Sequence, residues 1–166
     1  MSCLLAGVQR TGIIIEGKTY LYKRKHSTGK EEYEWDKPLP LKEWPHPALQ
    51  ADIMETTELT THPTEIFTDG SKIGDKLGAG VATYTNKRLV RKCKYSLLNH
   101  CSNNQAEQIA ILKSLEQLLS LPDKTNRIVA IYTDSKVTMD SLKNNTIHSV
   151  LIEEIRNMVR NLTKQN

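Results

Sequence analysis

Two short segments, FTDGS and YTDSK, each place an aspartate directly after an aromatic residue and a threonine. The aspartates are Asp69 and Asp134, and each ends an apolar run that is typical of a β-strand. If the two strands are parallel neighbours, both carboxylates lie at the same end of the sheet, where open α/β sheets bind their ligands. The spacing therefore predicts a pair of acids at one sheet edge.

A third acid, Glu107, falls in the first turn of a predicted helix, AEQIAILKSLEQLLSL. Ile111, Leu115 and Leu118 follow on the same helix face and should pack on the sheet, which carries Glu107 to the sheet edge. Three carboxylates at one place repel one another unless a cation lies among them. Mg²⁺ suits such oxygen ligands, and two ions about 4 Å apart can promote phosphodiester cleavage.

Each acid also has an ordinary structural explanation. Asp69 before a glycine is typical of a turn, and Asp134 is placed to cap the next helix. Glu107 would complement the dipole of its own helix. All three explanations would have to hold together, so the combination favours a metal site.

The elements that must position these acids begin at Glu65. EIFTD predicts a strand ending at Asp69, LGAGVATYT a second strand, and RLVRKCKYSL a third, with a hairpin turn at Asn86 and Lys87. One face of the third strand is expected to carry alternating apolar residues, namely Leu89, Cys93, Tyr95 and Leu97. These strands form a predicted three-stranded antiparallel meander.

The remaining elements predict an α/β fold. Ser102 and Gln105 form a capping box for the helix, which should stop at Pro122, and RIVAIYTD predicts a parallel strand buried on both faces. A short helix over Ser135 to Asn144 and a last helix should follow, giving the order βββαβαα. The last helix is marked by an apolar stripe of Leu151, Ile155, Met158 and Leu162.

Composition bounds the class of protein. The chain has 166 residues, 38% of them hydrophobic, and a formal net charge of +4, which suits one globular domain with a tail and weakly favours a polyanionic partner. Cys3, Cys93 and Cys101 show no CxxC pairing, so we expect reduced thiols in an intracellular protein, cytoplasmic or nuclear and not secreted. No apolar run is long enough for a membrane span.

Residues 1–63 are rich in proline and are predicted to be a linker with one short helix or strand. They include GIIIEGKT, from Gly12 to Thr19, which matches a phosphate-binding loop with Lys18 as the phosphate contact. Three consecutive isoleucines favour a strand over such a loop, and no strand is evident before Gly12. Nucleotide binding is therefore the weaker alternative.

The motifs TDGSK, GAGVA, CSNNQAE and IYTDSK, in this order, resemble the type 1 ribonuclease H domain that follows the reverse transcriptase of non-LTR retrotransposons. The resemblance covers residues 64–166, and residues 1–63 resemble the connector between the two regions of such elements. It implies a ribonuclease H-like fold and Mg²⁺-dependent endonucleolytic cleavage of the RNA strand of an RNA/DNA hybrid. It also implies two ions, with Mn²⁺ as a substitute, and the parent reverse transcriptase as a partner.

The resemblance assigns roles to individual residues. Asp69, Glu107 and Asp134 would be the catalytic residues and metal ligands. Contacts to the substrate would come from Gly70, Ser71, Asn103, Asn104 and Gln105, because Asn and Gln amides can both donate to and accept from a 2′-hydroxyl.

The chain also departs from the family pattern. Members of the family continue with another strand, a histidine-bearing loop and a helix that carries a fourth metal aspartate, and neither His148 nor Glu153 and Glu154 match these. We therefore expect an incomplete domain whose sheet lacks its final strand and helix. The alternative function is a catalytically inactive retroelement remnant that keeps the fold and at most weak nucleic-acid binding.

Overall fold

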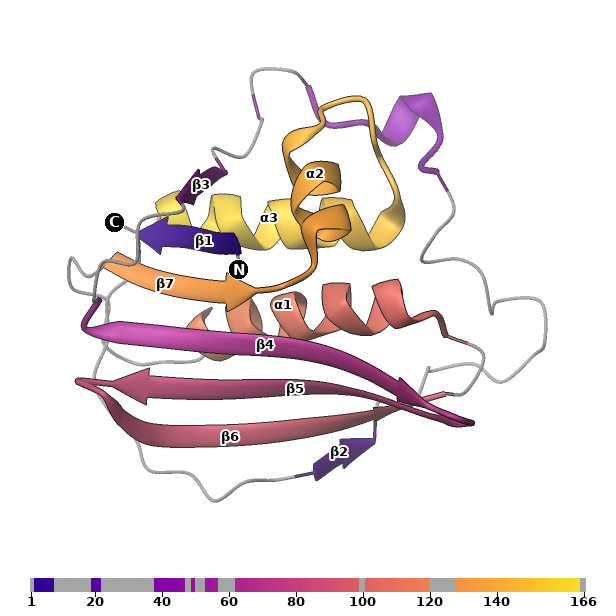
Figure 1. Cartoon of the computed structure of the whole chain (residues 1–166). Helices are drawn as coiled ribbons and strands as arrows, with labels where there is room; N and C mark the ends of the chain where they lie inside the picture. Colours follow the sequence, from indigo (N-terminus) through magenta and orange to yellow (C-terminus); the bar gives the residue numbers. More distant parts are fainter. Residues whose placement is uncertain are drawn as a thin grey trace.

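The computed structural model describes residues 2–7, 19–21, 38–46, 49, 53–56, 62–98, 101–119 and 128–164 (Figure 1). In this part of the chain a single sheet has the strand order β2-β6-β5-β4-β7-β1-β3, and helices α1 and α3 lie side by side against it. The elements are β1 (Ser2–Gly7), β2 (Thr19–Leu21), β3 (Met54–Thr56), β4 (Thr64–Ile73), β5 (Lys76–Thr85), β6 (Arg88–Leu97), α1 (Asn103–Leu119), β7 (Ile128–Thr133), α2 (Lys136–Lys143) and α3 (Val150–Lys164).

The centre of the sheet confirms the predicted α/β fold. Strands β4, β5 and β6 form an antiparallel meander, and β7 pairs parallel with β4 after the chain has crossed over through α1. Asn86 and Lys87 turn the second hairpin with positive φ angles of 49° and 63°, as a tight hairpin between right-twisted strands requires. The order βββαβαα is therefore correct from β4 onward.

The core lies between the sheet and α1, and α3 packs beside α1. Ile111, Leu115 and Leu118 of α1 are buried, so this helix face packs as its sequence predicted. In β7 the buried residues include Val129, Ala130 and Ile131, consistent with a strand covered on both faces. On α3 the predicted stripe is buried at Leu151, Ile155 and Leu162 and half-buried at Met158.

Two local predictions are wrong. Strand β4 does not end at Asp69 but continues to Ile73, because β5 pairs with it along its whole length. Leu89 is 52% exposed and does not share the buried face of Cys93. The β5–β6 register shifts between Thr83 and Tyr84, and one extra residue in a strand moves what precedes it to the opposite face.

The segment before residue 63 contributes three strands, where one short helix or strand was expected. Strand β1 pairs antiparallel with β7, from Ser2 opposite Thr133 to Gly7 opposite Ile128, and β3 pairs with the outer edge of β1. The sequence predicts no strand beyond β7, but β1 and β3 occupy that position. Without them the unpaired backbone N–H and C=O groups of β7 would be open to pairing. Most of the GIIIEGKT match and the predicted helix stop at Pro122 lie outside the described residues.

Candidate metal centre

The three predicted acids meet at one end of the sheet. One carboxylate oxygen from each of Asp69, Glu107 and Asp134 can be chosen so that all lie within 4.8 Å of one another. The parallel pairing of β4 and β7 explains the two aspartates, because its last pair is Phe67 with Tyr132 and each aspartate lies two residues further on. Asp69 and Asp134 are exposed, whereas Glu107 is buried beneath them with 7% exposure.

A close approach of α1 to β4 brings Glu107 to the aspartates. A Cβ atom on Gly70 would lie 2.5 Å from the Glu107 backbone nitrogen and 2.9 Å from its Cδ. No side chain fits in that space, so the glycine after Asp69 serves helix packing and does not form a turn. The hairpin turns later, at Gly74, which has a φ of 57°.

The capping box fixes where α1 begins. The Ser102 backbone N–H donates to Gln105 Oε1 at 2.8 Å, and the Gln105 N–H donates to Ser102 Oγ at 3.1 Å. This reciprocal pair confirms the predicted capping box and fixes the start of α1 at Asn103. Glu107 is the fifth residue of the helix and so lies just beyond the first turn, in which it was predicted.

The ordinary explanations of the two aspartates are wrong. Ser135, not Asp134, is the N-cap of α2, with its side chain accepting a hydrogen bond from the Thr138 N–H. Asp69 is not in a turn but lies inside β4, paired with Gly80. Neither a turn nor a helix cap therefore accounts for these two aspartates.

The electrostatics of the cluster are unfavourable to a third negative charge. The pKa of Glu107 is raised from its ordinary 4.5 to about 7, chiefly by burial; the nearby charges of Asp134 and Asp69 contribute to the rise, and a hydrogen bond from the Gly70 backbone opposes it. The Oε2 atom of Glu107 is buried and has no hydrogen-bond partner in the described part of the chain. A buried carboxylate oxygen without a partner is costly unless a cation or a proton satisfies it.

The donor set fits a hard divalent cation. It consists of carboxylate oxygens alone, which are the ligands that Mg²⁺ and Mn²⁺ prefer. The unpartnered Glu107 oxygen provides an acceptor at the centre of the cluster. Within the described ranges no further Asp, Glu, His or Cys joins the three acids.

The predicted substrate residues surround this cluster but differ in accessibility. Gly70 is buried under α1, and Ser71 follows it as an exposed residue of β4. In the first turn of α1, Asn103 is exposed, Asn104 is half-buried, and Gln105 is only 3% exposed because it belongs to the capping box.

Two further polar contacts near the site were not foreseen from the sequence. Thr138 of α2 directs its hydroxyl toward Asn104 Oδ1 at 3.4 Å. Lys72 donates from Nζ to the Cys101 carbonyl at 3.4 Å, which joins β4 to the residues before α1. Neither contact follows from local spacing, because each joins segments at least 29 residues apart.

No curated protein matches the sequence. Among solved structures, the RNase H1 of the halophilic archaeon Halobacterium salinarum is similar, with 18% sequence identity and a TM-score of 0.45 over 61% of this chain and 77% of that one. The model of the RNase H family matches residues 61–166, which include all three clustered acids. On the strength of that match over well more than half of its length, the chain belongs to the RNase H family.

Proposed function

We propose that this protein is a Mg²⁺-dependent ribonuclease that hydrolyses the RNA strand of an RNA/DNA hybrid endonucleolytically. The observation that carries the proposal is the convergence of Asp69, Glu107 and Asp134 within 4.8 Å, with one buried Glu107 oxygen lacking a partner. Membership of the RNase H family supports the reaction class. The formal net charge of +4 supports a polyanionic substrate.

In this proposal the three carboxylates hold the cations. Two divalent ions at such a site supply an activated water and stabilise the leaving oxygen. Glu107 lies beneath the site, whereas the exposed Asp69 and Asp134 face solvent, so the scissile phosphate approaches from their side. The close packing at Gly70 keeps the three carboxylates in register.

Recognition of the RNA strand is assigned to the first turn of α1 and to the adjoining part of β4. Asn103 and Asn104 are accessible enough for their amides to meet a 2′-hydroxyl, a group that both donates and accepts. Gln105 is held in the capping box, where it fixes the helix turn that carries the two asparagines. Ser71 is exposed next to the acids and can approach the strand's backbone, while Gly70 allows the close packing beneath it.

We further propose a retroelement origin, with residues 1–63 as the connector to a reverse transcriptase that would be the partner in the parent element. The motif order from TDGSK to IYTDSK supports this origin. An intracellular location, cytoplasmic or nuclear, is supported by Cys93, a buried cysteine outside any disulfide. No helix among the described residues is long and apolar enough to cross a membrane.

A second candidate function is hybrid binding without cleavage. It is favoured by one observation: only three acids cluster in the described part of the chain, whereas the family resemblance implies four ligands. A site with fewer ligands holds at least one ion more weakly, and cleavage depends on both.

The two candidates are separated by incubating the full chain with an RNA/DNA hybrid over a range of Mg²⁺ and Mn²⁺ concentrations. Cleavage of the RNA strand that is lost in Asp69→Asn and kept in Asp140→Asn supports the ribonuclease; Asp140 is an exposed acid of α2 outside the cluster. Binding of the hybrid without cleavage at any concentration supports the second candidate. Cleavage that survives Asp69→Asn refutes the proposed site.

A further inference from the structure

Three side chains link the start of α1 to the start of α2. The Thr138 hydroxyl lies 3.4 Å from Asn104 Oδ1 and 2.8 Å from the Ser135 hydroxyl, and the Thr138 backbone N–H donates to Ser135 Oγ at 3.4 Å. Thr138 is fully buried, whereas Asn104 and Ser135 are half-buried. These contacts join the first turn of α1, which directly precedes Glu107, to the residue that follows Asp134.

The donors and acceptors of these groups fit together in one direction. Ser135 Oγ accepts from the Thr138 backbone N–H, which leaves the Ser135 proton for the Thr138 oxygen. The Thr138 hydroxyl then directs its own proton toward Asn104 Oδ1. Because the amide of Asn104 is planar, its Nδ2 group faces away from Thr138 when Oδ1 faces toward it.

We propose that Thr138 is a positioning residue for RNA recognition: it holds the Asn104 amide so that its N–H donors are turned outward to the 2′-oxygen of the RNA strand. This inference rests on the proposed function. A DNA strand has no 2′-oxygen, so the oriented amide would lose its acceptor, which penalises DNA. Thr138 acts through Asn104 and needs no contact with the substrate.

The test removes the hydroxyl and keeps the shape of the side chain. The full chain with Thr138→Val is compared with Thr138→Ser, which retains the hydroxyl, and with Thr146→Val as the matched control. Thr146 is exposed, and its hydroxyl donates to Asn144 Oδ1 at 2.8 Å, within the loop after α2. The measured quantity is the ratio of dissociation constants for an RNA/DNA hybrid and a DNA duplex of the same sequence.

We expect Thr138→Val to reduce this preference about 5-fold, the effect of losing one ordinary hydrogen bond. Thr138→Ser should restore most of the preference, and Thr146→Val should keep it. Asn104→Ala should lower the preference as far as Thr138→Val does, and the double variant should lower it no further, because the two residues act in one chain of contacts.

A second measurement does not depend on the folding of any Thr138 variant. Hybrids that carry a single 2′-deoxy nucleotide at successive RNA positions are bound to the wild-type chain and to Asn104→Ala. At one position the substitution should weaken the wild type and leave Asn104→Ala unaffected.

The outcomes separate this inference from the function on which it rests. A preference for hybrids that survives Thr138→Val, or a double variant whose losses add, overturns the role of Thr138 alone. A wild-type chain with no preference for the hybrid overturns the proposed function and this inference together.

Discussion

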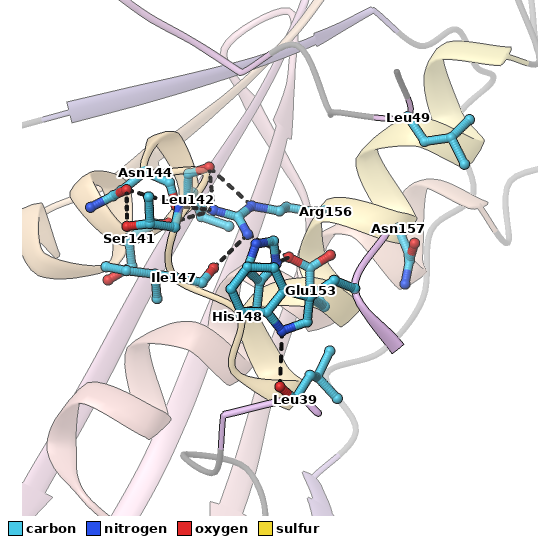
Figure 2. A network of polar contacts seen from close by, with 12 residues as sticks. Leu39, Leu49, Ser141, Leu142, Asn144, Ile147, His148, Glu153, Arg156 and Asn157 are labelled. Atoms are coloured by element: carbon cyan, nitrogen blue, oxygen red, sulfur yellow. Dashed lines mark hydrogen bonds and ion pairs between the residues drawn. The ribbon is translucent and has the colours of Figure 1, made fainter. Parts of the chain in front are cut away.

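Glu107 and Glu153 are equally well buried, with 7% and 4% exposure, but their surroundings have opposite charge. Glu153 Oε1 accepts from Arg156 Nη1 and lies 2.9 Å from His148 Nδ1 (Figure 2). Its Oε2 lies 3.9 Å from Arg160 Nη2. Glu107 instead faces Asp69 and Asp134.

The two glutamates differ in whether the described part of the chain neutralises their charge. Burying a carboxylate is expensive unless a positive charge accompanies it. At Glu153 the chain supplies that charge itself, whereas at Glu107 the described residues supply only more negative charge. A cation from solution would supply the missing positive charge at Glu107, in line with the proposed metal site.

The cluster around Glu153 also explains how the end of the chain is folded. The Arg156 guanidinium donates to backbone carbonyls at the end of α2 and in the loop before α3 (Figure 2). It therefore holds the α2–α3 corner, residues 141–156, together. The Trp44 ring packs against His148 with ring centroids 4.0 Å apart and a tilt of 31°, and the Leu39 N–H donates to the His148 carbonyl at 2.6 Å. The carbonyl acceptors are those of Ser141, Leu142, Asn144 and Ile147.

The largest expected effect on stability comes from removing the Arg156 guanidinium, the positive charge that accompanies Glu153. Arg156→Met keeps an apolar stem but leaves Glu153 buried without its main partner, and we expect the free energy of unfolding to fall by about 3–5 kcal/mol. Urea unfolding measures this loss. Arg88→Met, at an exposed arginine of β6, is the control and should change the stability by less than about 0.5 kcal/mol. An equal loss in both variants would contradict the structural role of Arg156.

The second effect concerns pH and has a definite sign. The pKa of Glu107 is raised to about 7, so between pH 4.5 and 7 the folded chain keeps a proton that the unfolded chain has lost. Without divalent ions, this group makes the free energy of unfolding fall as pH rises through that window, by up to about 3 kcal/mol. Glu107→Gln should remove this part of the pH dependence.

Added Mg²⁺ should also cancel the loss, but only in the protein that retains Glu107. The check is urea unfolding at pH 5 and pH 8, with EDTA or with Mg²⁺. If the free energy of unfolding of the wild type and of Glu107→Gln depended on pH in the same way in EDTA, the pKa of Glu107 would not be raised by its surroundings.

The third effect tests the close packing that places Glu107. Gly70→Ala inserts a methyl group where the nearest atom is backbone at 2.5 Å, and we expect a loss of about 1–3 kcal/mol together with weaker Mg²⁺ binding. Gly80→Ala is the matched control, because its Cβ would meet only Asp69 O, at 3.8 Å. Thermal unfolding with and without Mg²⁺ measures both quantities, and Mg²⁺ affinity that is unchanged in Gly70→Ala would contradict the packing argument.

The smallest effect concerns the segment before the family match. Trp44→Ala removes the ring that packs against His148, and we expect a loss of about 1 kcal/mol if residues 38–46 stabilise the corner. Leu41→Ala, at a residue that is 77% exposed, should cost little. Equal unfolding free energies for the two variants would show that this contact contributes nothing.

The parts of the site that were predictable from the sequence rest on local patterns. The capping box at Ser102 and Gln105, the apolar stripe that follows Glu107 and the motifs FTDGS and YTDSK are all local signals. Together they sufficed to predict that the three acids lie close to one another. The continuation of β4 beyond Asp69 depended on pairing with β5, which spacing alone does not reveal.

The cluster around Glu153 was missed for a related reason. Its cation Arg156 lies one helical turn away in sequence, but its other acceptors come from α2 and the following loop. The ring on His148 comes from Trp44, more than a hundred residues earlier. Similarly, the strand β1 beside β7 follows from long-range pairing and not from its own short sequence. The division of the chain at residue 63 stays a prediction.

Calorimetric titration of Mg²⁺ into the metal-free full chain at pH 7.5 tests most directly whether the three-carboxylate cluster is a cation site. The account predicts saturable binding to the wild type and to Asp140→Asn, and binding weakened at least about 10-fold in Asp69→Asn, because one of three ligands loses its charge. Equal affinities for Asp69→Asn and the wild type, or no binding by the wild type at millimolar Mg²⁺, would contradict it.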